Sequence, residues 1–174
     1  DKDLRNAYDG NLNDYKDTIP HVLHTNAFII LSNGIDAKVG TVTSPYKFFL
    51  DWKRIEEDQE GKVSLDTMLR GTCAPNRLMD LFENFLLFDE SRGDVVKLMA
   101  KNHQYIGVNK VLENVTNINE LKGKLGVFWH TQGSGKSYSM VFLCEKIHRK
   151  LGGAYTFLIA VDRTELENQL YDTF

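Results

Sequence analysis

Cysteine, long apolar runs and excess positive charge are all scarce in this sequence. Its two cysteines in 174 residues exclude a disulfide framework and favour a reducing, cytoplasmic setting. The longest apolar runs, such as residues 27–31, are too short to span a bilayer, and no apolar leader opens the chain, so no membrane is expected as a partner. Lysine and arginine number 21 against 24 acidic residues, which excludes a generally basic nucleic-acid coat but not a local basic track.

The composition is that of a folded protein. Hydrophobic residues make up 42% and charged residues 26% of the chain, which excludes a disordered tail, a collagen-like repeat and a coiled coil. The chain starts without methionine, and Phe174 falls within an expected helix. We therefore expect a fragment of a longer protein.

The first 90 residues predict a hairpin followed by helices. Residues 9–14 are polar and turn-rich, with no hydrophobic anchor of their own. An apolar run, a tight Asn33-Gly34 turn and a second run predict a hairpin over residues 27–43. Capping residues and prolines then predict helices that start at 44–45 (running through Trp52), at 64 and at 74–75. In the last of these, Leu78, Leu81, Phe82 and Phe85 share one face, and residues 85–88 are strand-like.

From about residue 95, strands and helices are predicted to alternate. The expected strands are 95–99, 125–129 and 155–161, and the expected helices are 102–115, 136–150 and 164–171. That order predicts an α/β fold in which crossover helices connect the strands of a parallel sheet. The polar residues 89–94 separate the two patterns, and we place the domain boundary there.

A glycine-rich motif follows the expected strand 125–129 and opens the expected helix. It reads His130-Thr131-Gln132-Gly133-Ser134-Gly135-Lys136-Ser137. Glycines allow backbone N–H groups to converge on an anion, and the start of a helix adds partial positive charge. This context predicts a P-loop, with residues 131–137 around the phosphates of ATP, Lys136 on the β- and γ-phosphates and the Ser137 hydroxyl on Mg²⁺.

The alternative is a glycine turn that precedes Lys-Ser by coincidence. A Gly-x-Gly-Lys-[Ser/Thr] pattern should occur by chance in roughly 1% of chains of this length, and the flanking strand and helix lower that frequency further. His130 stands where the P-loop pattern has its first glycine. This variant is typical of helicase-like ATPases and argues against small-molecule kinases.

Two further groups are candidates for ligand contacts. Gln104 precedes the P-loop, and its amide has the donors and acceptor that suit N6 and N7 of adenine; an exposed polar helix start is the alternative. Arg163 and Thr164 follow the expected strand 155–161, at the edge where α/β sheets bind ligands. In nucleic-acid motors this loop holds the phosphodiester backbone; a helix cap at Asp162 beside a solvated Arg163 is the alternative.

Several blocks of the sequence together resemble the R (restriction and translocation) subunit of type I restriction enzymes. The P-loop with its flanks, residues 126–137, is similar to that family's version, and so are residues 160–170. Further similar blocks, in the family's order, are Ile19-Pro20 to Asn26, Ser32-Asn33-Gly34, Gly40-Thr41, Phe49-x-x-Trp52-Lys53 and His103-Gln104-Tyr105.

The resemblance implies two joined parts. Residues 1–90 would be the C-terminal part of a PD-(D/E)xK-type nuclease domain, and residues 91–174 the start of the first RecA-like lobe of a superfamily-two motor. The family's partners would be double-stranded DNA and the methyltransferase and specificity subunits of the same complex. ATP and Mg²⁺ would be the cofactors, and the family's enzymes are ATP-dependent deoxyribonucleases.

The chain departs from the family pattern in its nuclease part. The family has a Gln-x-x-x-Tyr element that contacts DNA; here Tyr15 is present, but Asn11 replaces the glutamine. The metal ligands of the nuclease should precede that element and thus lie outside this chain. Asp51-Trp52-Lys53 imitates part of a nuclease motif, but we predict it to be the solvated face of a helix.

Three hypotheses follow. The first is a fragment of an ATP-dependent, DNA-translocating endonuclease, inactive by itself because no acidic Walker B motif and no second lobe follow the P-loop in this chain. The second is a nucleotide-binding regulatory or scaffolding module without motor activity. The third is a different nuclease–motor fusion, such as a type III restriction subunit.

Overall fold

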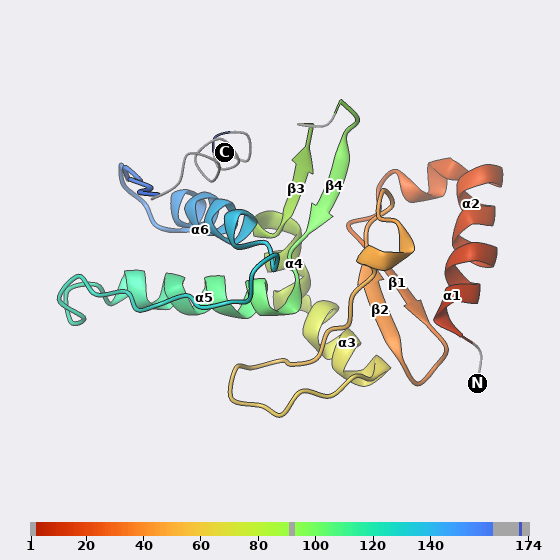
Figure 1. Cartoon of the computed structure of the whole chain (residues 1–174), viewed down its shortest axis with the longest axis horizontal. Helices are drawn as coiled ribbons and strands as arrows, with labels where there is room; N and C mark the ends of the chain where they lie inside the picture. The colour runs from red at the N-terminus through yellow and green to blue at the C-terminus, as the bar shows by residue number, and fades with distance from the viewer. Residues whose placement is uncertain (1–2, 91–92, 162–170, 172–174) are drawn as a thin grey trace. The chain divides into compact units, whose positions relative to one another are not determined.

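The computed structural model describes residues 3–90, 93–161 and 171. These residues form two compact units, Asp1–Asn102 and His103–Phe174, drawn in Figure 1 as short helices and two small sheets. The fold is mixed α/β, as the sequence predicts. Arg163 and Thr164, with all but the last residue of the helix expected over 164–171, lie outside the described residues.

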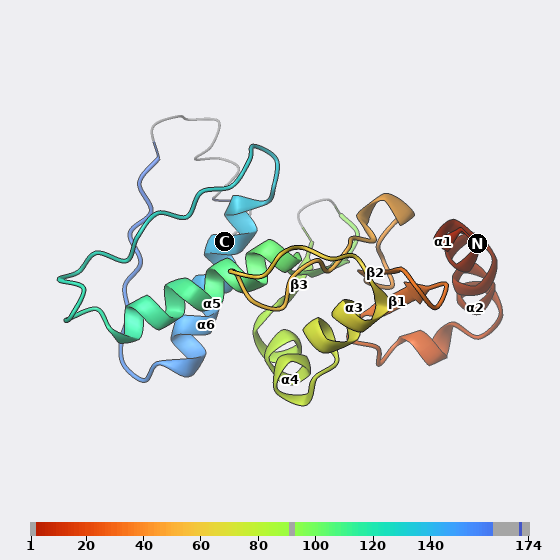
Figure 2. The ribbon, with the colours of Figure 1, turned by 90° about the horizontal axis from the view of Figure 1, so that it is seen from below.

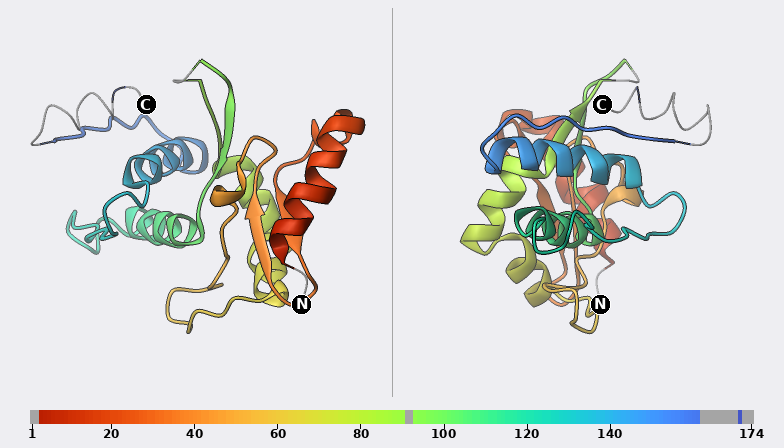
Figure 3. Two further views of the ribbon diagram at one scale, coloured as in Figure 1. Left: turned by 45° about the vertical axis from the view of Figure 1, so that its right-hand side comes forward. Right: turned by 90° about the vertical axis from the view of Figure 1, so that its left-hand side faces the viewer.

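The first unit begins with a helical stretch. It consists of α1 (Leu4–Asn6), a π-helical turn (Ala7–Leu12) and α2 (Asn13–Thr18). The prediction of a turn-rich start without an anchor is wrong, because Leu12 is buried together with Leu23 and Leu31. The π-helical turn contacts β1, so the stretch lies along one side of the first hairpin (Figure 3).

The predicted hairpin is confirmed. Strand β1 (Ile29–Ser32) pairs antiparallel with β2 (Ala37–Gly40). The Asn33 side chain shapes the turn, since its Oδ1 accepts hydrogen bonds from the backbone N–H groups of Ile35 (3.0 Å) and Asp36 (2.8 Å).

The helix predicted from Ser44-Pro45 through Trp52 does not form. A single 3-10 turn (Tyr46–Phe48) is followed by extended chain. Leu50 exchanges two backbone hydrogen bonds of 2.9 Å with Val39, which extends the hairpin sheet by one bridge. This pairing places Phe49 and Trp52 in the core, so the 51–53 segment is not the solvated face of a helix. Asp51 instead lies between two lysines, 2.8 Å from Lys38 Nζ and 3.8 Å from Lys53 Nζ.

The next two helices start where their capping residues predict. Ser64 caps α3 (Leu65–Thr72) by accepting a hydrogen bond from the Thr67 N–H, and Pro75 occupies the first turn of α4 (Pro75–Asn84). The predicted apolar face of α4 is only partly buried. Leu81 is fully buried, whereas Phe82 is 57% exposed.

A second antiparallel hairpin completes the first unit. Strand β3 (Leu86–Asp89) pairs with β4 (Val96–Met99), so the strands predicted near 85–88 and 95–99 both exist. The domain boundary that the sequence suggested at residues 89–94 falls within this hairpin, since Asp89 ends β3 and Val96 begins β4. The two compact units instead divide after Asn102.

The second unit contains α5 (Asn102–Thr116, of which Asn102 belongs to the first unit) and α6 (Lys136–Lys150). Buried Val108 of α5 and Phe142 of α6 belong to its core. The Lys146 ammonium of α6 donates a 2.5 Å hydrogen bond to Asn109 Oδ1 of α5. Figure 2 shows the chain leaving the end of α5 and running back beside it to the start of α6.

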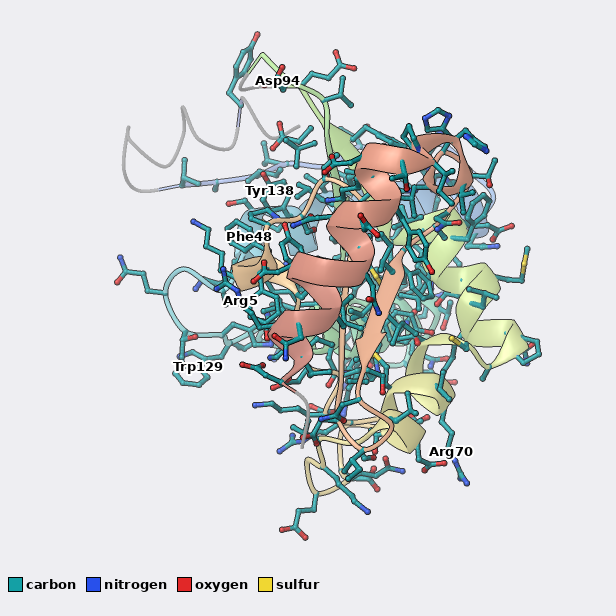
Figure 4. All side chains as sticks on the ribbon, turned by 90° about the vertical axis from the view of Figure 1, so that its right-hand side faces the viewer. Arg5, Phe48, Arg70, Asp94, Trp129 and Tyr138 are labelled. Atoms are coloured by element: carbon teal, nitrogen blue, oxygen red, sulfur yellow. The ribbon has the colours of Figure 1, made fainter. Side chains whose placement is uncertain are left out.

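The described residues contain no parallel sheet, because both of their sheets are antiparallel hairpins. The predicted strands 125–129 and 155–161 are present as chain without strand pairing. Val127 is 92% and Leu158 94% exposed, and the Trp129 ring points outwards (Figure 4). A strand in a parallel sheet bonds to strands that are connected to it by long crossovers, whereas the two strands of a hairpin bond to each other across a short turn. Among the described residues, no helix is long and apolar enough to cross a membrane.

Candidate nucleotide-binding site

The glycine motif forms a loop that leads directly into α6. Gly133 and Gly135 have φ angles of +75° and +92°, a left-handed conformation that side chains disfavour. Gly135 is the N-cap residue of α6, so the backbone N–H groups of the first turn are open to an anion. A Cβ atom on Gly133 would meet nothing within 4 Å, which leaves that side of the loop open.

Lys136 reaches back across this loop. Its ammonium donates hydrogen bonds to the carbonyl oxygens of His130 (2.9 Å) and Thr131 (3.0 Å). The side chain is exposed, and Ser137 follows it half-buried in the first turn of α6. Thr131 and Gln132 are exposed. The Lys136 ammonium and the Ser137 hydroxyl therefore lie together at a helix N-terminus, as a site for phosphate and a divalent cation requires.

The structure brings Gln104 to this loop from 31 positions away. Its side-chain Nε2 donates a 2.8 Å hydrogen bond to the Gly135 carbonyl oxygen. Gln104 is 3% exposed, so it is not the exposed polar residue of the alternative interpretation. The fold thus joins two features that the sequence only suggested were related.

Three rings that the sequence analysis did not assign lie beside the loop. His130 packs edge-to-face against Phe128 (4.4 Å between ring centroids) and against His103 (4.5 Å). The Nε2 atom of His103 lies 3.3 Å from the Ser134 carbonyl oxygen. Two signals pointed here: His103 directly precedes Gln104, and His130 is the departure from the P-loop pattern.

The surroundings of His130 disfavour its charged form. Burial, and secondarily the nearby Lys136 ammonium, lower the pKa of His130 below its ordinary value of 6.5. The unfolded chain therefore binds the proton more readily than the folded one, so the stability that neutral His130 contributes is complete above about pH 6.5 and lost as the pH falls below it.

We expect the stability of His130→Phe to depend less on pH than the stability of wild type. Thermal melts between pH 7.5 and pH 5 should show wild-type stability falling more steeply, because phenylalanine keeps the ring contacts but cannot take up a proton. His148→Phe, which changes an exposed histidine of α6, serves as the control. Equal pH slopes for wild type and His130→Phe would contradict the prediction.

Other predicted site residues belong to the first unit or lie outside the described residues. Tyr15 lies on α2, 51% exposed, four positions after Asn11 and hence on the same side of the helical stretch. Within the described ranges, no group of three or more His, Cys, Asp or Glu side chains is arranged to hold a metal ion.

Comparison with known proteins adds two findings. The family model of the SWI2/SNF2 ATPase matches residues 103–174, the extent of the second unit. The endonuclease subunit of the type I restriction enzyme HindI from Haemophilus influenzae is 35% identical over 170 residues, or 92% of this chain. Over almost its whole length the chain is similar to type I restriction endonuclease subunits.

Two relatives from Methanocaldococcus jannaschii bear similar names. The putative type I restriction enzyme MjaIXP endonuclease subunit is 27% identical over 98% of this chain. The putative MjaVIIIP endonuclease subunit is 32% identical over 74% of it. The chain spans 16%, 18% and 12% of the lengths of these three relatives.

Proposed function

We propose that this chain is part of the ATP-dependent, DNA-translocating endonuclease subunit of a type I restriction–modification enzyme. The observation that carries the proposal is the loop at 130–137, with two left-handed glycines, Lys136 across it and Gln104 bound to Gly135. The match of residues 103–174 to an ATPase family supports the same assignment.

The nucleotide is assigned to residues of the second unit. The main-chain N–H groups of residues 133–137 would surround the phosphate oxygens, and Lys136 would exchange its two carbonyl partners for the β- and γ-phosphates. The Ser137 hydroxyl would hold Mg²⁺, which supplies charge neutralisation on the phosphates. The donor set fits, since it consists of a hydroxyl, an ammonium and backbone amides on an open side of the loop. Gln104 would recognise adenine.

Exposed apolar segments support a larger sheet in the longer protein. Residues 125–129 and 155–161 carry side chains as exposed as Val127 and Leu158. Exposing such side chains to water is unfavourable by about 25 cal/mol per Å² of apolar surface. We propose that both segments are strands of a RecA-like parallel sheet, with Arg163 and Thr164 following the second strand to contact the DNA backbone.

The first unit is assigned to the nuclease domain. Its residues would form the C-terminal part of that domain, with Tyr15 beside the DNA and the metal ligands outside this chain. Because β4 pairs with β3, we now assign residues 91–102 to this part as well. The complete protein would act on double-stranded DNA together with methyltransferase and specificity subunits.

Calorimetry with this 174-residue chain tests the nucleotide assignment directly. We expect Mg-ATP to bind without turnover, because hydrolysis also needs an acidic Walker B side chain and a second lobe. Absence of Mg-ATP binding would refute the assignment, and Lys136-dependent hydrolysis would refute the expected inactivity. In the longer protein, an acidic Walker B motif within the next ~100 residues would favour the motor over a regulatory module.

Gly135→Ala should weaken Mg-ATP binding. Alanine disfavours a φ of +92° by about 1–2 kcal/mol, so the ligand-free loop of the variant would leave this conformation. Restoring it on binding would lower the affinity roughly five- to thirtyfold. The alanine Cβ atom would also lie 2.9 Å from Gln104 Nε2 and displace that side chain. Gly152→Ala is the matched control, because a Cβ atom there meets nothing within 4 Å. Similar affinities for the two variants would contradict this role of the loop.

A further inference from the structure

We propose that His103 is a positioning residue that sets the direction in which the P-loop amides point. The inference rests on the proposed nucleotide site and adds to it a residue that acts on the loop and not on the ligand. His103 contacts the loop at two points, His130 at its start and Ser134 in its middle.

The contact with Ser134 fixes a peptide plane. A carbonyl oxygen can only accept, so His103 Nε2 carries the hydrogen that points to the Ser134 oxygen at 3.3 Å. In a trans peptide the C=O and the N–H point in opposite directions. Holding the Ser134 oxygen on the α5 side therefore turns the Gly135 N–H to the other side of the loop.

Gln104 does the same for the next peptide plane. Its Nε2 donates a 2.8 Å hydrogen bond to the Gly135 carbonyl oxygen, which also accepts from the Ser139 N–H of α6 at 3.1 Å. With this oxygen held from both helices, the Lys136 N–H points to the opposite side of the peptide plane. Two consecutive residues of α5 thus hold two consecutive carbonyl oxygens. Two consecutive N–H groups are left on the opposite side, where a phosphate would accept from them.

The ring contacts keep His103 in place. The His103 ring meets the His130 ring edge-to-face at 4.5 Å, with an angle of 87° between the planes. His130 packs on Phe128, and Phe128 lies against Gly107 of α5, where a Cβ atom would overlap the ring. His103 and Gly107 of α5 are therefore linked to each other through the rings of His130 and Phe128 at the start of the loop. Such preorganisation lowers the cost of ordering the loop when a ligand binds.

The test compares His103→Ala with wild type in the 174-residue chain. Losing one hydrogen bond to the loop should weaken Mg-ATP about three- to tenfold. Magnesium tripolyphosphate, which has no base, should be weakened by the same factor. The ratio of ATP to GTP affinity should stay unchanged, because His103 acts on a peptide plane and not on the base. Gln104→Ala should reduce that ratio.

Further variants separate the role from a loss of folding. His103→Asn keeps a side-chain N–H and should recover part of the affinity, whereas His148→Ala, an exposed histidine on α6, should match wild type. Without nucleotide, hydrogen exchange of the 130–137 amides should speed up in His103→Ala, while circular dichroism should show the helical content of wild type.

Each contrary result has a distinct meaning. Wild-type binding of Mg-ATP with unchanged affinity in His103→Ala would overturn the positioning role alone. A changed ATP-to-GTP ratio in that variant would also overturn it, since His103 would then touch the base. No Mg-ATP binding by wild type would overturn the proposed function itself.

Discussion

Replacing Lys136 with alanine is expected to weaken Mg-ATP binding about tenfold to a hundredfold, the worth of a hydrogen bond to a charged group. The Lys136 ammonium already spans the loop to the carbonyl oxygens of His130 and Thr131. A phosphate in the loop would offer it full negative charge in place of these neutral acceptors. Titration calorimetry with the 174-residue chain measures the change.

Lys150→Ala provides the matched control for that experiment. Lys150 ends the same helix α6 and is exposed, so its loss removes an equal charge far from the loop along the helix. If both variants bind Mg-ATP as wild type does, Lys136 has no role in the site. The proposed function extends this to the complete subunit, where Lys136→Ala should still bind the proposed methyltransferase partner but fail to translocate DNA; normal translocation would remove the assigned role.

Trp52→Ala is expected to lower the free energy of unfolding of the first unit by about 3–5 kcal/mol, the usual cost of emptying a buried aromatic site. Trp52 is 1% exposed. Gly71 of α3 lies directly against its indole, where a Cβ atom would overlap the ring. Alanine would leave a cavity between the extended 49–52 segment and α3 that this close packing cannot fill. Urea unfolding followed by circular dichroism measures the loss.

Lys53→Ala separates the buried tryptophan from its exposed neighbour. The Lys53 side chain is 59% exposed, and its 3.8 Å ion pair with Asp51 lies at the surface, where such pairs contribute about 0–1 kcal/mol. Lys53→Ala should therefore change stability little, and Trp52→Phe should fall between it and Trp52→Ala. Equal effects of Trp52→Ala and Lys53→Ala would show that residues 51–53 are solvated, as the sequence alone suggested.

The sequence correctly predicted the elements whose conformation depends on residues close together in the chain. The first hairpin follows from two apolar runs around Asn33-Gly34, and α3 and α4 follow from their capping residues Ser64 and Pro75. The P-loop glycines were predicted for the same reason, since left-handed φ angles at Gly133 and Gly135 concern the residue itself.

The errors arose where a distant partner decided the conformation. Residues 49–52 resembled a helix, but Leu50 pairs with Val39 across the hairpin and takes Trp52 into the core. The strands near 85–88 and 95–99 were correctly located. Their antiparallel pairing with each other was not predicted, because the pattern of residues within a strand does not specify its partner. In the candidate site, His103 was missed because its partners His130 and Ser134 are far away in sequence.

By itself, the sequence indicated the family resemblance, the glycine-rich P-loop pattern and the residues proposed to serve it, because these depend on residue type and spacing along the chain. Only the tertiary structure decided that Gln104 and His103 hold the carbonyl oxygens of Gly135 and Ser134. It also decided that Trp52 is a core residue. The physical reason is that hydrogen bonds and burial require proximity in space, which the spacing of residues along the chain does not specify.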